Sequence, residues 1–426
     1  MPNRPKILIT NCVPLNGGDE ALLRGLIAAL QSRLPGSHIT CLVKDLPRCR
    51  QHLPDLRLDS DLEFTPLQAD PATIPYTQSP NSVPIPQSAV SNPHWFAQHI
   101  STCHPDRARV LELYRQADLI LSAPGGFFHD HYPIEHRLRG LELALYLEKP
   151  TFLVGQSVGP FWKPESISRI REVFPRLTGI LLRDGLSLGY LRSAQVNTAH
   201  CHVTGDIAFL LPQRSKTPPP TSSRNPSHDA PSQLALGLRA WPLKDKPSLN
   251  RTIASGTELA SHLLSTTSAH LTLISTCQGI DGYHDDSLLS LAVFESLSPG
   301  LRSRVTIDRT RYHPSDLIAR LGSFDAYISM RLHGCLLAML AGTPALGIAY
   351  EPKTPEIFSQ LGLSDFQFPF TAPAPDWLAA ADRFLAAVPS LTHSLPDRIS
   401  AAALRASTNL DHIAAALHPH LQASAA

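Results

Sequence analysis

The sequence predicts an α/β protein with two consecutive domains, each built on a parallel sheet. Short apolar and β-branched runs alternate with longer helical segments along most of the chain. The alternation stops at a Pro- and Ser-rich stretch, 212–233, and restarts after it. The length of 426 residues is too great for one ordinary core and suits two domains. We therefore predict domains at 1–211 and 234–395, a linker at 212–233, and a C-terminal helix and tail at 396–426.

In the N-terminal half, strands are expected at short apolar runs and helices between them. The expected strands are 6–10, 38–44, 118–122, 151–154, 179–182 and 202–204. The expected helices are 19–34, 107–115, 135–148, 164–174 and a segment after Asp184 through Leu191. Residues 65–93 are rich in Pro, Gln, Ser and Asn without periodicity, which predicts an irregular insertion.

The C-terminal half repeats this alternation. The expected strands are 234–238, 271–275, 305–307, 324–329 and 346–350. The expected helices are 251–265, 285–297, 314–321, 332–341, 376–387 and 396–417. The segment 332–341 is apolar nearly all round, which predicts a buried helix, and Gly342 and Pro344 are typical of a helix end. Two such halves predict two Rossmann-like domains that face a cleft.

Charge and cysteine content exclude several classes of protein. The net charge of +1, from 37 basic and 36 acidic residues, indicates no nucleic-acid partner. Seven scattered cysteines without CxxC spacing argue against a disulfide framework and for a reducing compartment. The chain shows no signal peptide and no apolar run of membrane-spanning length. We expect a soluble cytoplasmic protein; peripheral association with the inner face of the membrane and the oligomeric state are left open.

Polar and Gly-rich residues follow the carboxyl end of nearly every expected strand, which is where open parallel sheets bind ligands. This indicates one cleft lined from both domains. The candidate residues are Asn16, Gly17, Gly18, Asp19, Gly125, Gly126, Asp130, Gln156, Arg183, Arg239, Arg331, His333 and Lys353.

The residues after two neighbouring strands of the C-terminal half predict an anion site. Arg331 and His333 lie in the first turn of the expected helix 332–341, and Lys353 follows the next strand. The free N–H groups of a helix N-terminus add to these cations, so a phosphate or carboxylate is the natural ligand. The alternative is that Arg331 caps a surface loop and His333 is a core histidine.

Three short patterns are similar to other kinds of site. Residues 16–19 form neither a GxGxxG nor a Walker loop, and Asp19 would repel a phosphate, so it suits a hydroxyl as acceptor or base. The histidines at 129, 131 and 136 lack a metal-binding spacing, so no metal is expected. Residues 155–159 match GxSxG, but Pro160 does not suit the helix that follows a nucleophile elbow.

Taken together, the motifs resemble the polysaccharide pyruvyl transferase family over about 5–210 and 233–365. The residues that carry the resemblance are Asn16–Ala21, Gly125–Asp130, Gly155–Pro160, Arg183-Asp184 with Ser187, Gly205–Phe209, Ser329–His333 and Tyr350–Lys353. The resemblance implies a GT-B-like fold. It also implies transfer of pyruvate from phosphoenolpyruvate to two hydroxyls of a glycan sugar, which forms a cyclic ketal and releases phosphate. No metal and no cofactor are implied, and the setting is cell-surface or exopolysaccharide biosynthesis.

Combined with the anion site, the resemblance assigns roles to the candidates. Phosphoenolpyruvate needs several cations in a small volume, because it carries a phosphate and a carboxylate on three carbons. We expect His333 to be the general acid and Asp19 to be the base for the acceptor hydroxyl. The expected donor-binding residues are Arg183, Arg239, Arg331 and Lys353, and the expected acceptor or cleft loops contain Asn16, Gly17, Gly18, Gly125, Gly126, Asp130 and Gln156.

The acceptor is expected to be a glycan or a lipid-linked saccharide, but the resemblance to the family does not identify which one. The insertion and the linker are longer than the family pattern, and only two glycines precede Phe127 where members often show three. Two other functions are kept open. A GT-B sugar-nucleotide glycosyltransferase would need base and ribose contacts that the sequence does not identify. A non-catalytic glycan-binding protein is disfavoured by the joint presence of Arg183, Arg331, His333 and Lys353.

Overall fold

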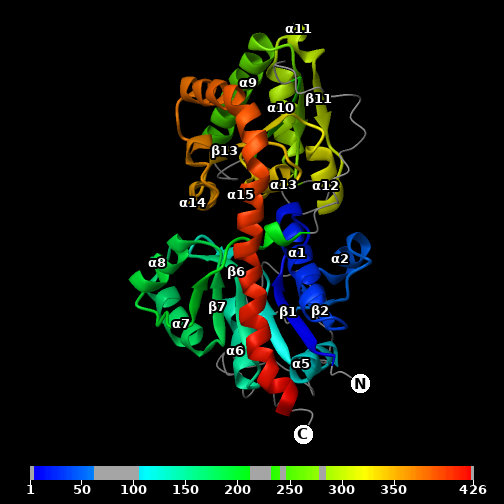
Figure 1. Ribbon diagram of the computed structural model, residues 1–426, viewed down its shortest axis with the longest axis vertical. Coiled ribbons are helices and arrows are strands. Elements are labelled where there is room, and N and C mark those ends of the chain that lie inside the picture. The colour runs from blue at the N-terminus through cyan, green and yellow to red at the C-terminus, as the bar shows by residue number, and fades with distance from the viewer. Residues whose placement is uncertain (1–3, 62–104, 212–231, 240–245, 278–284, 424–426) are drawn as a thin grey trace, which may run out of the picture. The chain divides into compact units, whose positions relative to one another are not determined.

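The computed structural model describes residues 4–61, 105–211, 232–239, 246–277 and 285–423 (Figure 1). The predicted insertion at 65–93 and all but the end of the predicted linker lie outside these residues. Contacts divide the chain into two compact units. The first unit contains the described residues of Met1–Pro14, Ala29–Thr204 and Thr408–Ala426, and the second those of Leu15–Ala28 and Gly205–Ser407. Both are α/β units with parallel sheets, so the predicted fold class is confirmed.

The first unit is a parallel sheet with helices packed against it. Its strands are β1 (Lys6–Cys12), β2 (His38–Val43), β3 (Leu58–Ser60), β4 (Leu119–Ser122), β5 (Gly125–Phe128), β6 (Thr151–Val158), β7 (Gly179–Leu182) and β8 (Cys201–Val203). Its helices are α2 (Leu46–His52), α5 (Pro105–Gln116), α6 (Glu135–Tyr146), α7 (Pro164–Val173), the 3-10 helix η1 (Phe174–Arg176) and α8 (Gly185–Ser193). The strand order is β3-β2-β1-β4-β6-β7-β8, with β5 paired to β6. The central strands are buried along their length, as expected for a parallel sheet covered on both faces.

One predicted loop of the first unit is a strand. Gly125–Phe128 was expected to be a loop, but it forms β5, which pairs with the end of β6 through Gly125↔Gln156 and Phe128↔Val158. Phe127 and Phe128 are both buried in the core between α6, α7 and the sheet. Their burial explains the difference, because two apolar rings after two glycines hold this segment against the sheet although it lacks the β-branched pattern of a strand.

His136 gives the first unit a predictable dependence on pH. Burial and, to a smaller extent, the charges of Lys44 and Arg137 together lower the pKa of His136 in α6 to about 4 from an ordinary value of 6.5. Between these values the unfolded chain binds a proton that the folded chain does not, so the free energy of unfolding falls as pH drops through this window.

We expect a His136→Gln variant to lose less stability than the wild type between about pH 7 and about pH 5. Urea unfolding at both values measures the difference, and comparing the two slopes cancels the contribution of carboxylates common to both chains. Equal slopes for the two proteins would contradict the buried, neutral state of His136.

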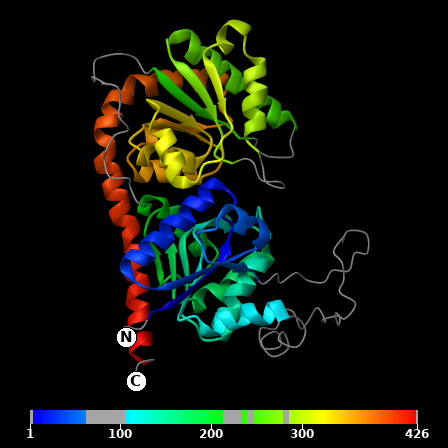
Figure 2. The same ribbon diagram turned by 90° about the vertical axis from the view of Figure 1, so that its right-hand side faces the viewer.

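The second unit is a parallel sheet with helices on both faces (Figure 2). Its strands are β9 (Gln233–Gly237), β10 (His270–Ile274), β11 (Val305–Asp308), β12 (Ala326–Ser329), β13 (Ala345–Ala349) and β14 (Gln367–Pro369). Its helices are η2 (Ile207–Leu210), α9 (Lys246–Thr266), α10 (Ser287–Ser296), α11 (Pro299–Arg302), α12 (Pro314–Leu321), α13 (Leu332–Leu340), α14 (Lys353–Gln360) and η3 (Ser364–Phe366). The strand order is β11-β10-β9-β12-β13-β14.

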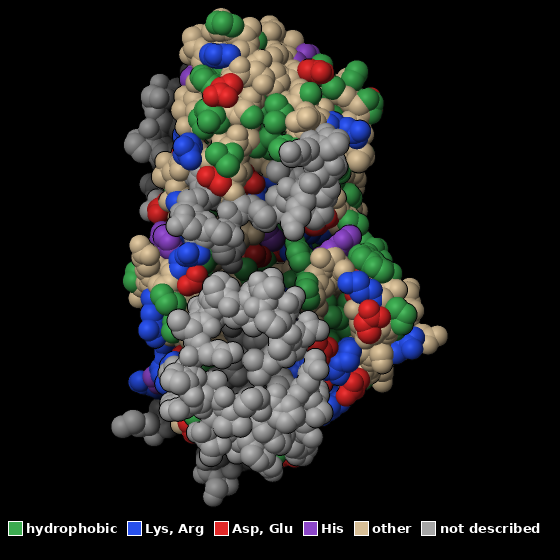
Figure 3. Space-filling view, turned by 180° about the vertical axis from the view of Figure 1, so that it is seen from behind, with side chains coloured by type: hydrophobic (Ala, Val, Ile, Leu, Met, Phe, Trp, Pro, Cys, Tyr) green, Lys and Arg blue, Asp and Glu red, His purple; other side chains and the backbone are tan. Residues whose placement is uncertain are grey.

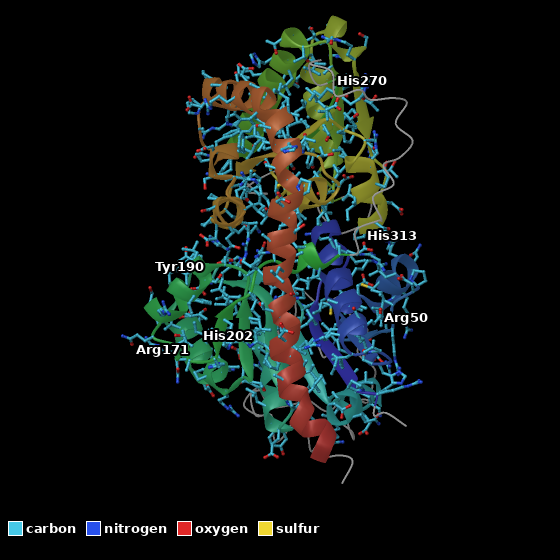
Figure 4. The ribbon with its side chains drawn as sticks, in the orientation of Figure 1. Arg50, Arg171, Tyr190, His202, His270 and His313 are labelled. Carbon is cyan, nitrogen blue, oxygen red and sulfur yellow. The ribbon has the colours of Figure 1, made fainter. Side chains whose placement is uncertain are left out.

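The first part of α1 (Gly17–Arg33) belongs to the second unit, although the sequence places it in a domain spanning 1–211. Glu20 is buried and its Oε1 accepts from Arg24 Nε and lies 2.7 Å from His313 Nδ1, just before α12 (Figure 4). The backbone also approaches closely, because a Cβ on Gly17 would lie 2.5 Å from the Thr276 carbonyl oxygen. These contacts place the residues after β1 with the second sheet.

The C-terminal helix is continuous where two helices were expected. α15 runs from Ala374 to Ala423 and includes Pro389 and Pro396, so the predicted boundary at 396 falls inside a helix. Proline removes a backbone hydrogen bond from a helix interior, which is why the sequence predicts a break. One buried apolar stripe nevertheless crosses both prolines, formed by Val388, Leu391, Leu395 and Ile399. Packing along this stripe favours a single helix.

The distribution of charge on the described surface and the state of the cysteine side chains are consistent with the amino-acid composition. Lys and Arg side chains are interspersed with Asp and Glu over the described surface visible in Figure 3, as the net charge of +1 suggests. The cysteines in the described residues are free thiols, and all of them are buried except the half-buried Cys201.

Candidate functional site

The second sheet gathers the predicted cationic residues where its strand order reverses. β9 and β12 are neighbours with the register Ser329↔Gly237; β10 and β11 continue beyond β9, and β13 and β14 beyond β12. Arg239 follows β9, and Arg331 and His333 follow β12. In open parallel sheets, ligands bind outside the carboxyl ends of the strands at this reversal. Three of the predicted residues therefore lie at the expected ligand-binding edge.

Helix α13 begins at this edge. Arg331 occupies its N-cap position with extended backbone, and its N–H donates to Ser329 Oγ at 3.0 Å. His333 lies in the first turn, and the helix behind it is buried, as predicted. The first N–H groups of the helix and its positive dipole end favour an anion here. The side chain of Arg331 is only 12% exposed, which disfavours the alternative that it caps a surface loop.

His333 lies beside a buried carboxylate. Its Nε2 is 3.6 Å from Oδ2 of Asp206, whose side chain is fully buried. The other oxygen of Asp206 accepts the N–H of Ala208 at 2.9 Å and caps η2, so the carboxylate is held from behind. An imidazole beside a fixed carboxylate can hold and release a proton at a defined position. Asp206 was absent from the predicted site; its only sequence signal was its place after β8 in the Gly205–Phe209 motif.

Gly18 allows α1 to approach this histidine. A Cβ at Gly18 would lie 2.9 Å from Nδ1 and 3.1 Å from Cβ of His333. Asn16 supports the approach, because its Oδ1 accepts the N–H of Gly18 at 3.1 Å and its carbonyl accepts the N–H of Glu20 at 2.8 Å. The residues from Asn16 to Gly18 thus form one wall of the His333 environment.

Arg331 is held by a bidentate ion pair. Its Nε and one Nη donate to the two oxygens of Asp286 at 2.7 and 2.8 Å. Burial alone would lower the pKa of Arg331, but the Asp286 carboxylate raises it well above its usual range. Arg331 therefore stays charged, and its planar group has a fixed orientation. Asp286 was not predicted, because it falls with Asp285 at the start of the expected helix 285–297, where an Asp is typical without any functional role.

Tyr350 contacts the two other predicted cations of the second unit, Arg239 and Lys353. Arg239 is buried, donates to Tyr350 Oη and lies 4.6 Å from the ring centroid. Nζ of Lys353 lies 5.8 Å from the same centroid and 2.5 Å from an oxygen of Glu351. The cations predicted after β9 and β13 thus lie beside the ring of one tyrosine. An anion that binds Lys353 would have to compete with the carboxylate of Glu351 for its ammonium group.

Cys277 shows that Asp19 belongs to this neighbourhood. Burial raises the pKa of the Cys277 thiol, and the charges that act on it include those of Arg331, Asp286, Arg239 and Asp19. The sequence places Asp19 in the predicted N-terminal domain, 1–211. The structure instead places it in the second unit, with the residues predicted to bind the donor.

The first unit contains a separate polar network around Arg183. This side chain is 1% exposed, and its Nε donates to Ser157 Oγ at 2.6 Å. Ser157 donates in turn to Asp184, whose other oxygen accepts the N–H of Ser187 at 2.7 Å. A Cβ on Gly126 would lie 3.2 Å from an Nη of Arg183, so this glycine leaves room for the guanidinium. The prediction that this edge lines one cleft with the other candidates stays a prediction.

Asp130 and Gln156 hold loops in place. Asp130 Oδ2 accepts the N–H groups of Trp162 and Lys163 at 2.6 and 2.7 Å. It does not cap the next helix, because the N-cap of α6 is Ile134. Gln156 is buried and its amide donates to the Ala123 carbonyl. Both residues therefore shape the edge formed by β4, β5 and β6.

No metal site or membrane span is found in the part of the chain that the structure describes. There, no three His, Cys, Asp or Glu side chains are arranged to hold a metal ion. Within the same residues, no helix combines the length and the apolar character that crossing a bilayer requires.

Comparison with known proteins decides the family. The family profile described as polysaccharide pyruvyl transferase matches residues 16–352, which include the His333 site and the Arg183 network. The chain belongs to the polysaccharide pyruvyl transferase family. It is therefore a transferase enzyme, and a glycan is its implied acceptor. The amylovoran biosynthesis protein AmsJ of Erwinia amylovora is 25% identical over 380 residues, which cover 84% of this chain and 86% of that protein.

Solved structures show that this pyruvyl transferase family member has a GT-B-type fold of two parallel-sheet domains. A glycosyltransferase from Rickettsia africae has a TM-score of 0.59 at 11% identity and covers 96% of this chain and 97% of its own. The UDP-GlcNAc 2-epimerase from Methanocaldococcus jannaschii has a TM-score of 0.54 at 12% identity and covers 90% of this chain and 93% of its own. At such low identity the likeness concerns the fold alone.

Proposed function

We propose that this enzyme transfers pyruvate from phosphoenolpyruvate to two hydroxyls of a glycan sugar in exopolysaccharide biosynthesis, forming a ketal and releasing phosphate. The observation that carries the proposal is the imidazole of His333, 3.6 Å from the buried carboxylate of Asp206, in the first turn of α13. Arg331 and Arg239 lie at the same sheet edge. The similarity to a protein of amylovoran biosynthesis supports an exopolysaccharide as acceptor.

The donor matches the charges of this edge. The phosphate and carboxylate of phosphoenolpyruvate are separated by one carbon, so they need cations from more than one direction. Arg331, oriented by Asp286, and the N–H groups of α13 supply one direction. Arg239 and Lys353 around Tyr350 supply another. Arg183 is proposed as a further donor-binding residue on the basis of the family motif.

His333 is proposed to protonate the enol methylene. A new C–H bond at C3 leaves C2 cationic, and the first sugar hydroxyl then forms a bond to C2. The C2–O bond to phosphate breaks, and the second hydroxyl adds to C2 to close the ketal. Two hydroxyl protons are released in total; one restores His333 and the other leaves with phosphate. Asp206 stabilises the protonated imidazole before transfer, and Asp19 is the proposed base for a hydroxyl.

One assay tests this function against sugar-nucleotide transfer. The protein is incubated with phosphoenolpyruvate, or separately with UDP-sugars, and an exopolysaccharide freed of existing ketals by mild acid. We expect phosphate release that depends on the acceptor, and a new ketal methyl signal in the proton spectrum of the glycan. Hexose transfer from a UDP-sugar without any reaction of phosphoenolpyruvate would overturn the proposal.

Gly18→Ala should lower the rate of this reaction about tenfold to hundredfold, because His333 would have to move away from the new methyl group. Initial rates at saturating phosphoenolpyruvate measure the effect. Gly189→Ala in α8 is the matched control, since a Cβ there meets nothing within 4 Å. Equal rates for both variants would show that the clearance beside His333 does not matter for catalysis.

A further inference from the structure

The first unit displays an aromatic surface that neither its core nor the proposed chemistry uses. Among the large hydrophobic side chains exposed in the described residues, the aromatic ones are Tyr132 at 45% and Trp162 at 52%. Tyr132 follows β5 and Trp162 follows β6, and these two strands pair with each other. Both side chains therefore lie at the carboxyl edge of the first sheet, where ligands of such sheets bind.

Two imidazoles join these rings into one surface. The ring of Tyr132 lies 4.8 Å from that of His129, His129 lies 5.3 Å from His131, and His131 lies 4.8 Å from Trp162. The side chain of His129 is largely buried, whereas that of His131 is exposed. We call Tyr132, His129, His131 and Trp162 the aromatic platform.

The platform is built on a rigid support. Asp130 Oδ2 accepts the backbone N–H groups of Trp162 and Lys163, and the N–H of Asp130 donates to the Pro160 carbonyl at 3.2 Å. Burial alone would raise the pKa of Asp130, but hydrogen bonds from Ser166 and from these backbone groups lower it. The ionised carboxylate thus ties the loop after β5 to the loop after β6. Tyr and Trp side chains have only two χ angles, so on a backbone fixed in this way they lose little conformational entropy when a ligand binds.

The chemistry of the platform favours a sugar ring. Exposed Tyr and Trp present flat apolar faces with a polar edge, which suit the C–H face of a pyranose, while an imidazole can exchange hydrogen bonds with its hydroxyls. Oδ2 of Asp130 accepts the backbone N–H groups of Trp162 and Lys163, and the side chain of Asp130 is buried, so the exposed part of the platform consists of aromatic rings. The family implies a glycan acceptor.

We propose that the aromatic platform binds a pyranose ring of the acceptor glycan by stacking on Trp162 and Tyr132. The inference rests on the proposed function in that the bound glycan is the acceptor of pyruvyl transfer. Trp162 and Tyr132 act in acceptor binding, whereas His333 acts on the donor.

The first test measures binding without the donor. Saturation-transfer NMR is recorded for the full chain with methyl β-D-galactopyranoside, methyl β-D-glucopyranoside and the acid-treated exopolysaccharide. We expect saturation of ring protons in the wild type, its loss in Trp162→Ala and Tyr132→Ala, and its retention in Trp162→Phe. Leu404→Ala is the matched control, because this side chain is 73% exposed on α15, outside the platform. Wild-type saturation that is equal in Trp162→Ala, or absent with every probe, overturns the proposal.

The second test separates acceptor from donor. Trp162→Ala should raise the KM for the exopolysaccharide about tenfold, the size expected for one lost aromatic contact, with kcat and the KM for phosphoenolpyruvate unchanged. Trp162→Phe should restore most of the loss. An unchanged acceptor KM together with normal phosphate release would overturn the platform while leaving the proposed function intact. Platform-dependent NMR binding without any reaction of phosphoenolpyruvate would support the platform and reject the proposed function.

The same variants test two other occupants of the platform, a second copy of the chain and a lipid surface. Sedimentation velocity reports whether Trp162→Ala alters self-association, and flotation with phosphatidylglycerol vesicles reports whether it alters membrane binding. We expect both to equal the wild type. A change in either, with glycan binding intact, would assign the platform to a second copy or to a lipid surface and overturn the proposal.

Discussion

Replacing His333 with alanine is expected to reduce phosphate release from phosphoenolpyruvate by about a hundredfold to ten-thousandfold, the usual contribution of a positioned general acid. The physical reason is the loss of the proton that makes C2 of the donor electrophilic. His333 is 16% exposed at the start of a helix, so its truncation should leave the unit folded. Phosphate release at saturating donor and acceptor measures the effect.

His270→Ala is the matched control for this prediction. His270 begins β10 and accordingly lies at the amino end of the second sheet, whereas His313 marks the carboxyl end (Figure 4). Its ring nitrogen lies 2.8 Å from Thr306 Oγ1. We expect a nearly wild-type rate for this variant. A His333→Ala enzyme that retained about a tenth of the wild-type rate would exclude His333 as the proton donor.

Asp206→Asn should have a smaller effect in the same direction. The amide keeps the size of the side chain and can still accept from Ala208, but it removes the negative charge 3.6 Å from His333. We expect kcat to fall while the KM for phosphoenolpyruvate stays nearly constant, because Asp206 is proposed to act on the donor only through His333. A pure rise in KM would indicate that Asp206 serves donor binding instead.

The second large effect is expected at the ion pair of Arg331 and Asp286. Arg331→Ala would leave the Asp286 carboxylate, only 3% exposed, without its bidentate partner. Breaking one partner of a buried pair costs about 3–5 kcal/mol of folding free energy. Arg331→Lys keeps the charge but loses the planar fork, so we expect a smaller loss of stability together with a higher KM for phosphoenolpyruvate. Urea unfolding and calorimetric titration with phosphoenolpyruvate measure the two quantities.

A double-mutant cycle separates folding from donor binding at this pair. Arg331→Met combined with Asp286→Leu removes both charges, so the double variant should recover most of the stability that either single change loses. It should not recover donor affinity if Arg331 contacts phosphoenolpyruvate. Unchanged donor affinity in Arg331→Lys would count against a direct contact and leave Arg331 with a structural role.

Local patterns were sufficient to predict the fold class and the position of two candidate residues at a strand end. The apolar runs that became β12 and β13, and the all-round apolar helix between them, follow from side-chain periodicity, which acts over a few residues. Arg331 and His333 could be placed at a sheet edge for the same reason, because the end of a strand and the start of a helix are local events. The family motifs added a chemical identity to these positions.

The partners of these residues depended on long-range packing. Asp206 meets His333, and Asp286 meets Arg331, across stretches of chain in which the sequence carries no pairing signal. Asp19 lies with the second unit because Glu20 and Gly17 pack on residues near 276 and 313, and α15 crosses two prolines because a buried stripe outweighs two lost hydrogen bonds. Strand and helix periodicity is determined by residues that are neighbours in the sequence. Charge pairing and helix docking depend instead on which distant surfaces the folded chain brings into contact.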